Sequence, residues 1–139
     1  MIFDETMRET LSTSKVIAII GAKDKGGQPV NMVGTYLIDQ GYTVIPVHPV
    51  RQNVWGLTTY KSVEDIPVPI DIVNVFRASQ HCLAHAEEVL ALEHKPKMFW
   101  MQSGIRSQDA GEKLAAAGIA VVEDKCIMVE HSRLGLEKK

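Results

Sequence analysis

The sequence contains only two cysteines, Cys82 and Cys126, among its 139 residues. They lie 44 positions apart, outside the CxxC and zinc-finger spacings, so neither a disulfide framework nor a structural zinc site is expected. A chain of this length can bury enough apolar surface to fold without such cross-links. Two free thiols are typical of a protein from a reducing compartment, and the sequence therefore predicts a cytoplasmic location.

The chain also lacks a strong charge of either sign and any long hydrophobic run. Its 15 basic and 17 acidic residues leave a net charge of −2, which gives no general attraction to nucleic acid or to an anionic membrane. The apolar runs are far shorter than the ~20 residues that a membrane-spanning helix needs. The N-terminal stretch MIFDETMRETLSTSK mixes charges into its apolar positions, unlike a signal peptide. Neither nucleic acid nor a membrane is predicted as a partner, and any anion site has to be local.

What the sequence does contain is a regular alternation of short apolar runs and helical patterns, with no linker or repeat between them. The runs are continuous rather than alternating, as in parallel strands that are covered on both faces. They predict five strands, at 16–20, 43–47, 71–76, 98–101 and 120–122. Helices are expected near 3–12 and at 30–40, 79–93 and 107–117.

Capping residues mark the ends of these helices. Ser79 and Ser107 are expected to cap the amino ends of the third and fourth helices, and Gly41 and Gly118 to end two helices in a left-handed conformation. Alternation of strands and helices implies right-handed crossovers between parallel strands. The predicted fold is therefore α/β: a Rossmann-like, doubly wound parallel sheet of about five strands, with helices on both faces, in a single domain over 1–139.

Ligands of such sheets bind outside the carboxyl ends of the strands, where the strand order reverses. The first strand is followed by a glycine-rich loop, GAKDKGGQP, at 21–29. Its glycines do not fit the G-x-G-x-x-G fingerprint for NAD, and the second strand ends in His48-Pro49 where an NAD site needs an acid for the ribose. A P-loop is excluded as well, because Gly27 and Gln28 stand where Lys and Ser or Thr are required.

The same loop has the properties of a local anion site. It carries Lys23 and Lys25 and leads into a predicted helix, whose first N–H groups attract anions. Taken by itself, the loop is equally typical of an ordinary βα turn with solvated lysines.

The exits of the next three strands offer further cations and contact groups. Pro49 and Arg51 combine a rigid turn with a guanidinium, which suits a flat ring next to a phosphate. Phe76 and Arg77 follow the third strand, and the turn at 102–104 lets backbone approach a ligand. For Arg51 the alternative is a solvated surface side chain, and for Phe76 it is a core position.

No catalytic or metal constellation accompanies these groups. Nothing brings His131 to Cys126 as an activating base, so a structural thiol is the favoured interpretation of Cys126. His81 and His85 have the spacing of a zinc pair but lack the HExxH glutamate, so an exposed helix face is predicted instead. The residues thus describe a binder of a phosphorylated, adenine-type ligand, with no catalytic residue and no metal ligand.

Four segments of the chain together carry a family resemblance. They are IAIIGAKDKGGQP…VGTYLIDQGYTVIPVHP, YKSVEDIPVPIDIVNVFR, MFWMQSGIRSQDA and GIAVVEDKCIMVEH. In combination they resemble the small single-domain CoA-binding proteins, which are similar to the N-terminal CoA-binding domain of the succinyl-CoA synthetase α subunit. The similarity spans about residues 10–134 and implies non-catalytic binding of coenzyme A or an acyl-CoA.

The resemblance also implies which residues contact the ligand. The loop after the first strand would hold the CoA phosphates, through Gly21, Ala22, Lys23, Lys25 and Gly26. The turn after the second strand would hold the adenosine phosphate part, through Pro49 and Arg51 beside His48. The third and fourth strand exits would approach the pantetheine arm, through Phe76, Arg77, Gln102 and Gly104, with Cys126 lining the same crevice.

Two residues depart from the family pattern, because Lys23 and His48 stand where members often have Ser and Asn. The phosphohistidine of the synthetase lies in a second domain that is not represented in this sequence, so ligase activity is not implied. An alternative hypothesis is an NAD(P)-dependent oxidoreductase in which His48 and Arg51 accept a 2′-phosphate, although no Tyr-Lys or His-acid pair is evident. A third is a regulatory or interaction module that senses an acyl-CoA and docks on a partner. The protein partners considered are a second copy of the chain, in a homo-oligomer, or a larger acyl-CoA enzyme.

Overall fold

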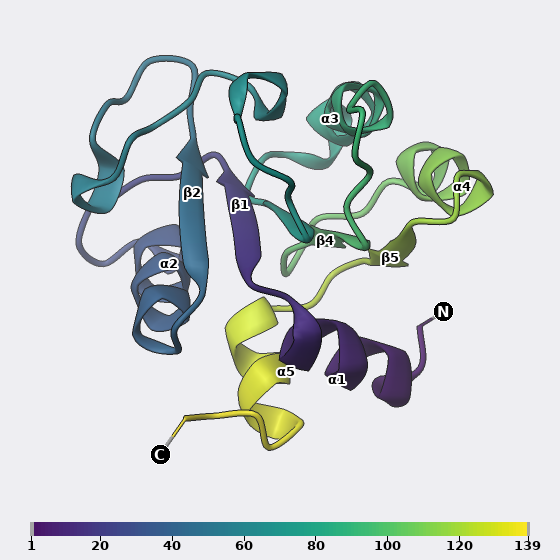
Figure 1. Cartoon of the computed structure of the whole chain (residues 1–139), viewed down its shortest axis with the longest axis horizontal. Coiled ribbons are helices and arrows are strands. Elements are labelled where there is room, and N and C mark those ends of the chain that lie inside the picture. The colour runs from purple at the N-terminus through teal and green to yellow at the C-terminus, as the bar shows by residue number, and fades with distance from the viewer. Residues whose placement is uncertain (1, 139) are drawn as a thin grey trace.

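A computed structural model describes residues 2–138, in which a five-stranded parallel sheet lies between two layers of helices (Figure 1). The strands are β1 (Val16–Ile20), β2 (Thr43–Val47), β3 (Ile72–Val75), β4 (Met98–Met101) and β5 (Ala120–Val122). The helices are α1 (Asp4–Thr13), α2 (Pro29–Asp39), α3 (Cys82–Leu90), α4 (Gln108–Ala116) and α5 (Ile127–Arg133). The predicted α/β fold is confirmed. None of these helices, within the described part of the chain, has the length and apolarity that crossing a membrane requires.

The strand order is β2-β1-β3-β4-β5, and every neighbouring pair is parallel. Ile17 of β1 is in register with Val44 of β2 on one side and with Ile72 of β3 on the other. The chain therefore leaves β1 toward β2, then returns past β1 to build the rest of the sheet. This reversal places the topological switch point between the carboxyl ends of β1 and β3.

Each face of the sheet has its own hydrophobic core. Ala18 and Ile20 of β1 belong to the core that α3 and α4 cover, whereas Ile17 and Ile19 belong to the core under α1, α2 and α5. Figure 1 shows α3 and α4 on one side of the sheet and the other three helices on the opposite side. A buried Ile side chain contributes about 1.5–3 kcal/mol. Burial on both faces explains why the strands are continuously apolar in sequence.

Several predicted helix ends are confirmed. The Ser107 hydroxyl accepts a hydrogen bond of 3.2 Å from the Ala110 N–H at the start of α4. Gly41 and Gly118 follow α2 and α4 with φ of +95° and +82°, the left-handed conformation that glycine adopts without strain.

One expectation about the helices is wrong. Ser79 does not cap α3, because a 3₁₀ turn at 79–81 precedes the helix and the Ser79 hydroxyl accepts the Arg106 N–H at 3.0 Å. The helical patterns in the sequence do not identify α5, which follows β5. This short helix is positioned by tertiary contacts, since Ile127 is fully buried and donates its N–H to Oε1 of Gln102 at 2.9 Å.

The crossover from β2 to β3 has no α-helix. Two 3₁₀ turns, Val54–Gly56 and Val63–Asp65, occupy it instead. Tyr60 pairs with the outer edge of β2, donating its N–H to Pro46 and accepting the N–H of His48. This compact crossover brings residues near 60 to the carboxyl edge of the sheet.

Candidate functional site

The loop after β1 is held against both neighbouring strands. Gly21 has a φ of +84° and donates its N–H to the carbonyl of Val47 at 2.9 Å, while the N–H of buried Ala22 reaches the same oxygen at 3.2 Å. A Cβ at position 21 would lie only 2.5 Å from the carbonyl oxygen of Phe76. Glycine is therefore required here both by the backbone conformation and by the close approach of the β1 and β3 exits.

Three cations from different strand exits gather around His48. Lys23 comes from the loop after β1, Arg51 from the turn after β2, and Arg77 from the exit of β3. Burial lowers the pKa of His48, and the positive charges of Arg51, Lys23 and Arg77 lower it further. The structure thus brings together three of the cations that the sequence singled out.

His48 also shapes the turn in which it lies. Its Nδ1 accepts the backbone N–H groups of Val50, at 3.1 Å, and Arg51, at 2.9 Å. Nδ1 is therefore unprotonated, and the neutral ring carries its proton on Nε2 as a donor. An Asn side-chain oxygen makes equivalent bonds in an Asx turn, so His48 can fill the place of the Asn that the family resemblance leads us to expect here.

A cavity of about 180 Å³ lies at the switch point, on the side of the sheet that α3 covers. Gly21, Pro49 and Arg77 line it, as the strand-exit rule predicts. The remaining polar wall consists of side chains that the sequence did not assign to a site, namely Lys61, Ser62, His85 and Glu88.

This polar wall is internally hydrogen bonded. Glu88 accepts the Ser62 hydroxyl at 2.9 Å and Nδ1 of His85 at 2.6 Å. Nε2 of His85 is buried without a partner in the part of the chain that the structure describes. The predicted exposed face is wrong for His85, whose side chain is 15% exposed. No sequence signal marks this arrangement, because it depends on the crossover carrying Ser62 over α3.

A second cavity, of about 360 Å³, lies beside α2 and α5. It is lined by Gly27, Pro29, Met32, Val33, Phe76, Gln102, Ser103, Cys126 and Met128. Three of the predicted residues, Phe76, Gln102 and Cys126, therefore share one cavity. Gln102 is buried and fixed by the N–H of Ile127, and Cys126 is half-buried.

Three other predicted residues, Lys25, Gly26 and Gly104, line neither of these two cavities. Lys25 and Gly26 are exposed in the loop between β1 and α2. Gly104 is exposed too, with a φ of +81°, and its N–H already donates to Oδ1 of Asp124 at 2.6 Å. Asp124 also pairs with Arg106 at 2.6 Å, so this turn is closed by its own contacts.

The side chain of His131 is hydrogen bonded to Tyr36. Its Nδ1 shares a hydrogen bond of 2.7 Å with the Tyr36 hydroxyl, and burial lowers the pKa of its ring. Within residues 2–138, no group of three or more His, Cys, Asp or Glu side chains is arranged to hold a metal ion.

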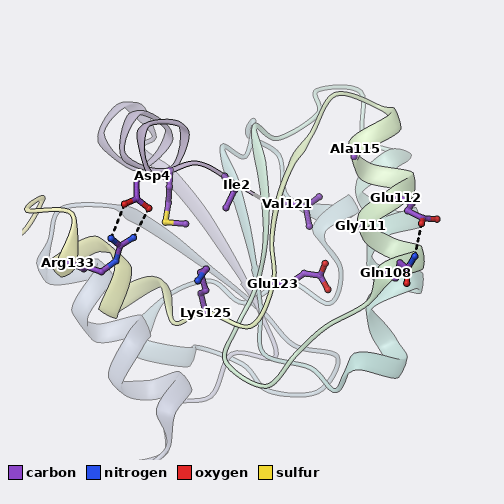
Figure 2. Close-up of a pocket in the computed structure, with 11 residues that line it drawn as sticks. Ile2, Asp4, Gln108, Gly111, Glu112, Ala115, Val121, Glu123, Lys125 and Arg133 are labelled. Atoms are coloured by element: carbon purple, nitrogen blue, oxygen red, sulfur yellow. Dashed lines mark hydrogen bonds and ion pairs between the residues drawn. The ribbon is translucent and has the colours of Figure 1, made fainter.

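A further cavity, of about 560 Å³, lies at the β5 side of the sheet between α1, α5 and α4 (Figure 2). None of the predicted site residues lines it. Its charged groups are of both signs and largely engaged: Asp4 pairs with Arg133 at 2.9 Å, and Glu123 accepts the Ser107 N–H at 3.0 Å. It therefore lacks the excess of cations found around His48.

Comparison with known proteins identifies relatives of this chain. The sequence model of a family described as "CoA binding domain" matches residues 15–132. The uncharacterized protein YneT of Bacillus subtilis is 38% identical over 126 residues, which cover 91% of this chain and 92% of that protein. A solved structure of a hypothetical protein from Pyrococcus horikoshii matches with a TM-score of 0.90 and 35% identity, covering 96% of this chain and 92% of that one. A 4-hydroxybutyrate–CoA ligase (ADP-forming) of Nitrosopumilus maritimus is 45% identical over 60 residues, 42% of this chain but only 8% of the ligase.

Proposed function

The chain belongs to the CoA-binding domain family, and from that membership we propose that it binds coenzyme A or an acyl-CoA between the exits of β1 and β3. The observation that carries the proposal is that the exits of β1, β2 and β3 line one cavity, through Gly21, Pro49 and Arg77. At the same edge, the charges of Lys23, Arg51 and Arg77 act on His48. Coenzyme A has a pyrophosphate and a separate 3′-phosphate, and its anionic groups match several separated cations on a protein of net charge −2.

Successive parts of coenzyme A can be assigned to successive strand exits. Lys23, beside the Gly21 turn, would hold the pyrophosphate near the start of α2, where the positive end of the helix dipole favours anions although Pro29 lacks an N–H. Pro49 and Arg51 would hold the adenosine and its 3′-phosphate. The pantetheine arm would then pass Phe76 toward the cavity beside α2 and α5. Bound in this way, coenzyme A would supply a thiol or thioester.

We further propose that the protein is a carrier or regulatory module rather than an enzyme. The two histidines near the crevice are already engaged: Nδ1 of His48 accepts the Val50 and Arg51 N–H groups, and Nδ1 of His85 is bound by Glu88. Among the described residues, neither histidine is hydrogen bonded to a nucleophilic side chain. Acyl transfer through a protein nucleophile needs such a pair, because the histidine activates the nucleophile as a base. Its small-molecule ligand would then be coenzyme A or an acyl-CoA, and its protein partner an enzyme that makes or uses the acyl-CoA. Both partners would meet in the cytoplasm.

Isothermal titration with CoA, dephospho-CoA and NADPH tests this function. CoA should bind, and Arg51→Ala should weaken CoA by about 10- to 100-fold, the effect of a hydrogen bond to a charged group, but weaken dephospho-CoA much less. Arg106→Ala is the matched control, because Arg106 is occupied by Asp124 and should leave both affinities unchanged. Failure of CoA to bind at millimolar concentration, with NADPH binding instead, would refute the function. Equal losses for CoA and dephospho-CoA would remove Arg51 from the 3′-phosphate.

A further inference from the structure

The cavity beside α2 and α5 is suited to an uncharged group. Among residues 2–138, no Lys, Arg, Asp or Glu lines it. Of its polar side chains, Gln102 has its Oε1 occupied by the Ile127 N–H, and Ser103 is exposed to solvent. A carboxylate placed here would lose hydration without gaining a cation, which is unfavourable.

The apolar lining includes a side chain that the fold itself does not use. Met32 of α2 is 56% exposed although it is a large hydrophobic residue. It lines the cavity together with Met128 of α5 and Phe76 at the exit of β3. Methionine side chains are flexible and polarizable, so they adapt to apolar groups of different shape. A ligand in the cavity would remove this apolar surface from water, which is a favourable change.

The cavity is lined in part by the loop after β1 and by the exit of β3, which the proposed CoA site also uses. Gly27 of the loop after β1 lines it at one side, and Gln102 at the exit of β4 lines it as well. A ligand whose phosphates contact that loop can therefore place its thioester end in the cavity. Taking the proposed CoA site as given, we propose that the cavity receives the acyl group of an acyl-CoA and that this group is apolar and uncharged.

Isothermal titration of the wild-type protein with CoA, acetyl-CoA, butyryl-CoA, hexanoyl-CoA and succinyl-CoA tests the assignment. Affinity should rise along the apolar series, by about fourfold for each methylene that becomes buried. Butyryl-CoA should therefore bind roughly tenfold or more tightly than acetyl-CoA. Succinyl-CoA, with the same number of acyl carbons but a carboxylate, should bind more weakly than butyryl-CoA.

A double variant, Met32→Ser with Met128→Ser, should lose the dependence on chain length while keeping its affinity for CoA itself. Val68→Ser is the matched control, because Val68 is a 46% exposed apolar residue outside the cavity and should leave the whole series unchanged. Urea unfolding verifies that both variants are folded. If the double variant does not fold, the dependence of wild-type affinity on acyl chain length and charge tests the assignment by itself.

Two results would overturn the acyl assignment while leaving CoA binding intact. One is equal affinity for CoA and every acyl-CoA, and the other is tightest binding of succinyl-CoA. A double variant that changed the oligomeric state in sedimentation, with its chain-length dependence intact, would also overturn it, because the cavity would then be a contact between copies. Absence of binding by CoA itself is a different result, since it refutes the proposed function as a whole.

Discussion

Replacement of Gly21 by Ala is the sharpest test of how the β1 and β3 exits meet. The added Cβ would lie 2.5 Å from the carbonyl oxygen and 3.1 Å from the carbonyl carbon of Phe76. Both partners are fixed by the sheet, because Phe76 donates its N–H to Ile20 at 2.9 Å and Gly21 donates to Val47 at 2.9 Å. The clash involves backbone on both sides, so it cannot be relieved by a side-chain rotation.

The expected loss of stability has two parts. A non-glycine residue held at a φ of +84° costs on the order of 1–3 kcal/mol. Overpacking against a fixed neighbour costs about 1–3 kcal/mol more. Gly27→Ala separates the two parts, because Gly27 has a φ of +82° but nothing within 4 Å of its added Cβ. Gly21→Ala should therefore be destabilised by about 2–6 kcal/mol and Gly27→Ala by only the conformational part.

Urea unfolding followed by circular dichroism measures both variants against the wild type. The slope of the unfolding free energy with urea should stay the same in all three proteins, since the folded and unfolded states expose the same surface. The midpoint should fall much further for Gly21→Ala than for Gly27→Ala. Equal losses for the two variants would refute the close contact between the loop after β1 and the exit of β3.

Two further predictions concern ionisable groups. In an NMR titration His48 should have a pKa below 6.5, and Arg51→Ala should raise that pKa toward 6.5 by removing a neighbouring positive charge; an unchanged value would contradict the cation cluster. The hydrogen bonds from Arg133 hold the pKa of the Asp4 carboxyl below its ordinary 3.8, so this pair stabilises the fold above pH 3.8 and the stabilisation is lost as pH falls through the lowered value. Asp4→Asn should therefore unfold at a lower urea concentration than the wild type at neutral pH, with the difference disappearing in acid. A difference that persisted there would assign the effect to something other than this ionisation.

Much of this architecture follows from local sequence patterns. The runs 16–20, 43–47 and 98–101 coincide with observed strands because they are long enough, and apolar enough, to be buried on both faces. The cations could be predicted for a geometric reason, since parallel strands all end at one edge and the residues after them must share that edge. Lys23 and Arg77 are far apart in the chain, yet they act on one imidazole.

The remaining features depend on contacts that no local pattern contains. Ser79 has the chemistry of a helix cap, but its hydroxyl is taken by the N–H of Arg106 from another loop. The cluster of Ser62, His85 and Glu88 forms only because a helix-free crossover passes over α3. A Glu three residues after a His on a helix otherwise resembles a solvated face, so the hydrogen bonds of Glu88 to Ser62 and His85 could not be predicted.

The strand order also has a consequence for how the chain is made. Ile17 finds its β2 partner, Val44, 27 positions later, but its β3 partner, Ile72, only 55 positions later. At a synthesis rate of about 5–20 residues per second, β1 waits roughly 1–5 s for β2 and roughly 3–11 s for β3. The β1–α2–β2 unit can therefore assemble first, with one edge of β1 still open. The β1–β3 pairing forms afterwards, and the proposed crevice lies between the carboxyl ends of these two strands. A ligand bound there would contact both the N-terminal β1–α2–β2 unit and the part of the chain that is made later.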